Sequence, residues 1–126
     1  MAINPTGVEL KSLLSEDPGG SVVMLNLLRF ADGGAELYAQ YAAHTTPFLK
    51  KYGGEVLYAG TGSTALVAEA GQAWDAVAIV RYPSRQAFCN MVADPGYQQG
   101  TDLRTRALVE AVLQATIPQT PRESKL

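Results

Sequence analysis

Residues 22–29 read Val-Val-Met-Leu-Asn-Leu-Leu-Arg, and this stretch decides the fold. A short apolar run bounded by glycines predicts a β-strand that is apolar on both faces. A second run of this kind covers residues 74–82, where Val77 and Ile79 alternate with alanine and valine. An antiparallel strand with one wet face should alternate apolar and polar side chains. Both faces of the predicted sheet must therefore be covered.

The rest of the chain completes an α+β pattern. Helical spacing and turn residues predict helices over residues 35–52 and 85–93, strands over 55–69 and 108–117, and a short turn or helix through Leu103. Pro47 is expected to kink the first helix or to start a second turn capped by Thr46, and Ser84 to cap the second helix.

The order β-α-β-β-α-β is the ferredoxin-like pattern, a four-stranded antiparallel sheet with both helices on one face. The simplest cover for the other face is the sheet of a second copy, so we expect a homodimer. A length of 126 residues fits one domain. We expect it over residues 21–117, after a lead-in (1–20) with a short helix capped by Thr6 and Glu9, and before a flexible tail (118–126).

Composition narrows the classes of partner. The net charge is −2, with both signs scattered along the chain, which disfavours nucleic acid. Residues 1–18 lack the apolar stretch of a signal peptide, and no 18-residue apolar run occurs, so we expect a cytoplasmic protein without membrane contact. Cys89 is the only cysteine and His44 the only histidine, which predicts neither a disulfide, nor a metal site, nor a bound cofactor.

Three residues are candidates for one site. Asn26 is the one polar residue inside its apolar strand; it either satisfies neighbouring backbone or orients a ligand. His44, at the edge of the apolar helix face, is either structural or a catalytic acid/base. Trp74 either packs at the end of a strand or walls a pocket. We expect the three to approach one cavity between sheet and helix, unless Asn26 faces the dimer interface.

Three further residues complete the ligand-binding candidates. Tyr41 lies on the same helix as His44. Arg81 is expected to bury its stem and to pair with Glu69 or Glu110, or else to bind a ligand carboxylate. Tyr97 either closes the pocket mouth or acts as an aromatic plug.

Several short motifs occur in order over residues 21–116: Met24-Leu25-Asn26-Leu27-Leu28-Arg29-Phe30, Tyr38-Ala39-Gln40-Tyr41, Tyr52-Gly53-Gly54-Glu55-Val56-Leu57, Trp74-Asp75, Arg81-Tyr82-Pro83-Ser84 and Asp94-Pro95-Gly96-Tyr97. They resemble the domain-of-unknown-function family 1330 (DUF1330), within the dimeric α/β-barrel superfamily. The resemblance implies the fold and the dimer, and it carries no agreed activity.

Within that superfamily, heme-degrading and cofactor-free monooxygenases use an Asn on the first strand and a Trp on the third, and Asn26 and Trp74 look similar in placement. The heme enzymes also use a His on the second helix, and residues 85–91 contain none. This difference argues against heme, and the similarity to the superfamily's enzymes leaves one interpretation as a cofactor-free enzyme, monooxygenase- or isomerase-like, acting on a small organic molecule. The alternative is a non-catalytic dimer that binds a small molecule or serves as a stress-related accessory protein.

Overall fold

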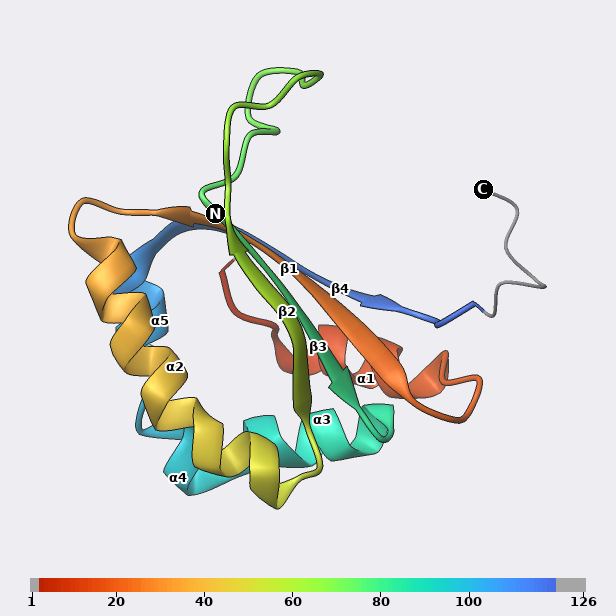
Figure 1. The fold of residues 1–126 in the computed structure, drawn as a ribbon. Coiled ribbons are helices and arrows are strands. Elements are labelled where there is room, and N and C mark those ends of the chain that lie inside the picture. Colours follow the sequence, from red (N-terminus) through yellow and green to blue (C-terminus); the bar gives the residue numbers. More distant parts are fainter. Residues whose placement is uncertain (1–2, 120–126) are drawn as a thin grey trace.

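The computed structural model describes residues 3–119 (Figure 1). Its elements are, in chain order, α1 (Gly7–Ser15), β1 (Val22–Phe30), α2 (Gly34–Lys51), β2 (Glu55–Thr61), β3 (Ala76–Tyr82), α3 (Arg85–Ala93), α4 (Pro95–Gln98), α5 (Thr101–Ala107) and β4 (Leu108–Thr116). The predicted β-α-β-β-α-β order is confirmed. α1 is the short helix expected in the lead-in, and α4 and α5 form the segment expected as a turn or short helix through Leu103, with α5 continuing to Ala107.

The four strands form one antiparallel sheet in the order β2-β3-β1-β4. The two strands with apolar side chains on both faces, β1 and β3, are therefore the central pair. In the register, Asn26 stands opposite Ala78 on β3 and Leu113 on β4. Because residues opposite one another share a face, these three side chains point to the same side of the sheet.

All the helices lie on that same side, which we call the helix-side face (Figure 1). The burial of β1 follows from this arrangement: Val22, Met24 and Leu28 are almost completely buried. Val23, Leu25 and Leu27 alternate with the helix-side residues and point to the opposite face, where no element of residues 3–119 covers the strands. We call this the open face. Its centre consists of Val23, Leu25, Leu27, Val77 and Ile79, which are only partly buried within one chain.

Local sequence explains where the helices begin and how they are anchored. Thr6 and Glu9 form the predicted capping box of α1, and Ser84 accepts from the Ala87 amide at 3.0 Å to cap α3. α2 continues through Pro47 as one helix, and the Thr46 hydroxyl donates back to the Ala42 carbonyl instead of capping a new turn. Arg85 donates to the Leu13 carbonyl at 2.9 Å, which ties α1 to α3.

β2 is shorter than its sequence predicts. It ends at Thr61, and residues 62–75 form a loop that projects beyond the sheet (Figure 1), with Leu66 and Val67 98% and 95% exposed. The Gly62 amide donates to the Asp75 carbonyl at 2.7 Å, so the hairpin closes there and the apolar residues beyond it leave the sheet. Trp74, expected within the next strand, lies in this loop, because β3 begins at Ala76.

Within the described residues, no helix is long and apolar enough to cross a membrane. The predicted flexible tail falls mostly outside those residues, since the description ends at residue 119. The domain limits, the tail and the cytoplasmic location stay predictions from the sequence.

Candidate ligand-binding cavity

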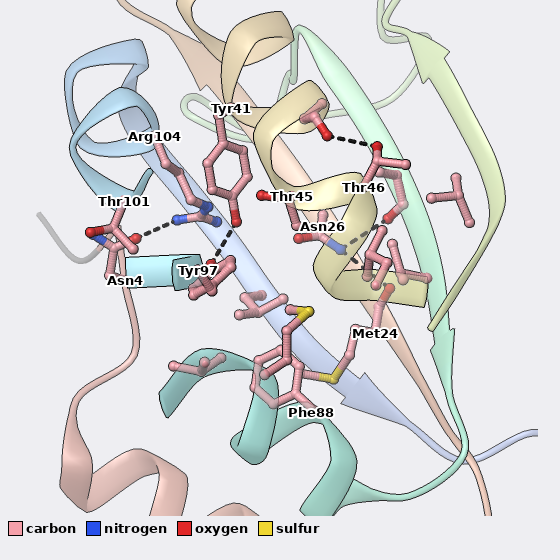
Figure 2. A pocket seen from close by; sticks show the side chains of 18 of the residues that line it. Asn4, Met24, Asn26, Tyr41, Thr45, Thr46, Phe88, Tyr97, Thr101 and Arg104 are labelled. Carbon is pink, nitrogen blue, oxygen red and sulfur yellow. Dashed lines mark hydrogen bonds between the residues drawn. The ribbon is translucent and has the colours of Figure 1, made fainter. Parts of the chain in front are cut away.

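A cavity of about 320 Å³ lies between the helix-side face and the helices (Figure 2). It reaches the surface between α2 and the edge strand β2, because its exposed lining residues include Ala42 and Thr46 from α2 and Val56 and Ala59 from β2. A volume of this size is at the lower end of the range typical of sites for small organic ligands.

Most of the cavity wall is apolar. Met24, Val80 and Leu113 form its floor on the sheet, and Phe88 and Met91 of α3 form one side. Met24, Phe88 and Met91 belong to the main hydrophobic core and are at most 5% exposed. An organic group placed against these side chains would gain free energy from leaving water.

One full charge stands in this apolar wall, on Arg104. Its side chain comes from α5 and is buried, with only 4% of the residue exposed. The Nη1 group donates to the carbonyl of Ile3 and, at 2.8 Å, to Oδ1 of Asn4 (Figure 2). The Nη2 group is buried and donates to nothing within residues 3–119. Arg104 also acts on the nearby Tyr38 hydroxyl, where it counteracts part of the rise that burial causes in the pKa of that phenol. Its Nη2 group keeps hydrogen-bonding capacity that residues 3–119 leave unused.

Arg104 also lacks a counter-ion in the part of the chain that the structure describes. None of the ion pairs formed there includes it, and no Asp or Glu lines the cavity. A buried guanidinium without an anionic partner is costly, by several kcal/mol for an isolated charge. An anion bound in the cavity would supply the missing partner, with the planar geometry that suits a carboxylate.

Tyrosine hydroxyls surround the same part of the cavity. The hydroxyls of Tyr41 and Tyr97 are 2.6 Å apart, and Figure 2 shows Tyr41 and Arg104 directed toward the same region. Burial raises the pKa of Tyr38 to about 12 and also raises the pKa of Tyr41 and Tyr97. All three phenols are therefore neutral at physiological pH. Because one hydrogen of the Tyr41–Tyr97 pair lies between the two oxygens, the other is left for a ligand.

Two smaller polar groups complete the lining. Thr45 lies one turn after Tyr41 on α2, and its buried Oγ1 has no hydrogen-bond partner among the described residues. Asn26 donates from Nδ2 to the carbonyls of Met24 and Ala78, both at 3.4 Å. These are long hydrogen bonds, and they leave the amide oxygen of Asn26 as a possible acceptor.

The structure brings together half of the residues proposed from the sequence. Asn26, Tyr41 and Tyr97 line the cavity, and Asn26 points toward the helices rather than into the open face. His44 does not line it. Its Nε2 hydrogen-bonds the Gly96 carbonyl at 2.9 Å, and its ring packs 5.4 Å from that of Phe48. The edge of α2 that carries His44 faces α4, so the imidazole joins two helices instead of meeting Asn26.

Trp74 and Arg81 also lie away from the cavity, which corrects the predicted meeting of Asn26, His44 and Trp74. The ring of Trp74 packs under the guanidinium of Arg29, at 4.6 Å, at one end of the open face. Arg81 points to the open face and is exposed, with Glu55 3.9 Å away. The partners predicted for Arg81 were wrong: Glu110 instead pairs with Arg29 at 2.9 Å.

The sequence reading missed Arg104 and Thr45. Arg104 was missed because the segment was expected to end its turn or helix by Leu103, whereas α5 continues to Ala107. A helix over these residues puts Thr101 and Arg104 on one side, three residues apart, and both line the cavity. That spacing was the available signal, but five of the seven residues of α5 are polar, which looks like a solvated surface.

Known proteins show the same fold and give no activity. The chain is similar to RPA0582 of Rhodopseudomonas palustris, a protein of unknown function, with 31% identity over 94% of this chain and 98% of that one and a TM-score of 0.86. It shares the fold of a dimeric ferredoxin-like protein of unknown function from Thermobifida fusca (14% identity, 79% of this chain and 92% of that one, TM-score 0.52).

A third similar structure is a dimeric protein of unknown function and ferredoxin-like fold from Bacteroides fragilis (7% identity, 76% of this chain and 94% of that one, TM-score 0.53). No curated protein matches the chain. The model of the family described as "Domain of unknown function (DUF1330)" matches residues 28–115. The chain therefore belongs to the DUF1330 family.

Proposed function

We propose that this protein binds a small organic carboxylate in the cavity between its sheet and its helices. The observation that carries the proposal is the buried Nη2 group of Arg104, which stands in an apolar wall without a hydrogen-bond partner or a counter-ion among the described residues. In the proposed complex, the carboxylate accepts a hydrogen bond from this Nη2 group, and the phenol pair of Tyr41 and Tyr97 donates a further hydrogen bond to it. The organic body lies against Met24 and Phe88.

Binding is favoured over acid/base catalysis by what the lining lacks. Among the described residues, no carboxylate, imidazole, thiol or ammonium group lines the cavity. Its titratable groups are arginine and tyrosines, and those tyrosines with a shifted pKa have it raised. A general base works best with a pKa near the operating pH, and no group here meets that requirement.

A cofactor-free enzyme of the monooxygenase or isomerase type is the second candidate. The observation that favours it is the cluster of neutral phenol donors beside a buried cation, an arrangement that stabilises a developing oxyanion. In this case the substrate itself must supply a reactive carbanion or enolate. Consumption of oxygen, or exchange of substrate hydrogen with deuterated water, would reveal such a reaction.

The test of the proposed function compares two probes of equal shape and different charge. Isothermal titration calorimetry of the unmodified protein with benzoate and with benzamide isolates the contribution of the carboxylate. We expect benzoate to bind at least about tenfold more tightly, since a charged hydrogen bond contributes roughly 1.5–3 kcal/mol. Equal affinity for both probes, or no binding of benzoate at millimolar concentration, would contradict the proposal.

We also propose that two copies of the chain pair through the open face. The side chains at its centre, Val23, Leu25, Leu27, Val77 and Ile79, are apolar and only partly buried in one chain. A contiguous apolar patch of this kind marks an interaction surface. The two ferredoxin-like proteins from Thermobifida fusca and Bacteroides fragilis are described as dimeric, which supports a second copy as the partner.

A further inference from the structure

A second cavity of about 340 Å³ lies under α1, against the edge strand β4. Leu10 and Leu13 of α1 form its roof, and Ala111 and Ala115 of β4 form part of its floor. The proposed carboxylate site leaves this space without a role.

The two cavities adjoin. Five residues line both of them: Asn4, Pro5, Met24, Phe88 and Leu113. The boundary between the cavities therefore consists of the flexible Met24 and the flat ring of Phe88 from the core, Leu113 on the sheet, and the segment before α1 with Asn4 and Pro5. That segment is tied to the charged end of the first cavity, since Arg104 donates to Ile3 and Asn4.

The second cavity suits an apolar occupant. Its polar lining residues are Asn4 and Glu9. Asn4 accepts from Arg104 at 2.8 Å and donates to the Thr105 hydroxyl at 2.9 Å. The Glu9 carboxylate accepts from the Thr6 amide at 2.8 Å in the capping box, an interaction that lowers its pKa. Because these groups already have partners within the protein, they offer a ligand little, and the remaining wall is apolar.

We infer that the carboxylate bound by this protein carries a long, unbranched aliphatic chain. This inference rests on the proposed function. The head group binds Arg104 in the first cavity, and the chain passes between Met24 and Phe88 into the second cavity under α1. Methionine adapts its shape readily, so a thin methylene chain passes where a ring does not.

The experiment is a calorimetric series with hexanoate, octanoate, decanoate and dodecanoate, each below its micelle concentration, with benzoate as the reference for the head group. Each methylene buried adds about 0.8 kcal/mol, so we expect affinity to rise up to about fourfold per added carbon through dodecanoate. If affinity stops rising at hexanoate while benzoate and hexanoate bind, the chain does not enter the second cavity and this inference is overturned while the proposed function stands. If none of the acids binds, both fail.

Two tryptophan variants on α1 locate the chain. Leu13→Trp fills the second cavity, whereas Ser12→Trp adds the same side chain on the exposed side of the same helix. We expect L13W to bind dodecanoate no more tightly than octanoate, and S12W to keep the full increase. Should L13W fail to fold, Leu10→Trp replaces it, and the chain-length series in the unmodified protein remains decisive. An unaltered series in a folded L13W or L10W protein would place the chain elsewhere and overturn the inference.

Discussion

The two faces of the sheet are incomplete in opposite ways. On the open face, charge is satisfied: Arg29 pairs with Glu110 at 2.9 Å, donates to the carbonyls of Gly71 and Ala73, and stacks on Trp74. What this face lacks is apolar cover. On the helix-side face the apolar side chains of the central strand β1 are buried. Among the described residues, the buried side-chain groups without a hydrogen-bond partner are Oγ1 of Thr45 and Nη2 of Arg104, and only Arg104 is charged.

This difference indicates what each face is missing. An apolar surface is completed by another apolar surface, and the partner proposed above for the open face is the sheet of a second copy. A buried cation inside an apolar cavity is completed by an anion small enough to enter. In the proposed functions, one sheet separates an assembly surface from a binding site, and we expect each to be altered by substitution without the other.

The largest effect is expected from a charge placed on the open face, which should disrupt the proposed dimer. Ile79 stands at its centre, opposite Leu25 and Tyr58. We expect Ile79→Lys to weaken dimerisation on the order of 1,000-fold, because twofold symmetry places two unpaired ammonium groups in one interface, each costing about 2 kcal/mol or more. Light scattering at micromolar concentration should change from about twice the chain mass to the monomer mass.

The control for that prediction adds the same charge outside the interface. Gln86 is exposed on α3, and Gln86→Lys should leave the dimer intact. An unmodified protein that is monomeric at micromolar concentration, or an I79K variant that remains dimeric, would remove the open face from the proposed interface.

The next largest effect is expected from removing the buried charge of the cavity, which should weaken ligand binding. We expect Arg104→Met to weaken benzoate binding on the order of 100-fold, since truncating one partner of a buried charge pair costs roughly 2–5 kcal/mol. The ligand-free protein should lose little stability, because removing the desolvation cost of the buried guanidinium offsets the loss of its hydrogen bonds to Ile3 and Asn4. Calorimetry and thermal unfolding measure the two effects. Wild-type affinity in the R104M variant would show that benzoate binds elsewhere.

The sequence predicted the fold well because fold depends on patterns that neighbouring residues repeat. The two-faced apolar strands, the Ser84 cap and the Thr6–Glu9 capping box are each local signals, and each was confirmed. The loop over residues 62–75 was predicted wrongly because Leu66 and Val67 look like strand residues; the hairpin closes at Gly62, which sequence alone does not reveal.

The candidate site was predicted less well because a site depends on where side chains point. The sequence left Asn26 with two possible directions, into the cavity or into the dimer interface. Only the register of β1 against β3 decides between them in favour of the cavity side. Placing His44 required the position of α4, because the imidazole hydrogen-bonds a carbonyl of that helix. Placing Trp74 required knowing where the loop before β3 closes. Arg104 resembles a surface residue in sequence and becomes notable only through its burial.

A smaller effect sharpens the description of the cavity. We expect Tyr97→Phe to weaken benzoate binding about fivefold, the equivalent of one hydrogen bond of about 1 kcal/mol, because it breaks the Tyr41–Tyr97 pair that directs a donor to the ligand. Tyr58 is 56% exposed and points to the open face, so Tyr58→Phe is the matched control and should bind benzoate normally. Equal affinities in the two variants would leave Arg104 as the only recognised polar anchor.

The smallest expected effect on binding comes from the other arginine, and it tests the comparison as a whole. Arg29→Met breaks the pair with Glu110, whose two side chains are 26% and 32% exposed, and the stacking on Trp74. We expect the free energy of unfolding, measured in urea, to fall by about 1 kcal/mol, because a partly exposed pair contributes modestly and its backbone hydrogen bonds add to it. Benzoate affinity should change less than about twofold, since Arg29 lies on the face away from the cavity.

The two arginines are then expected to behave in opposite ways: Arg29 supports stability without affecting binding, and Arg104 supports binding with little effect on stability. If R29M weakened benzoate binding as strongly as R104M does, the two faces would not be independent. A substitution on the open face would then change the affinity of the cavity through the sheet.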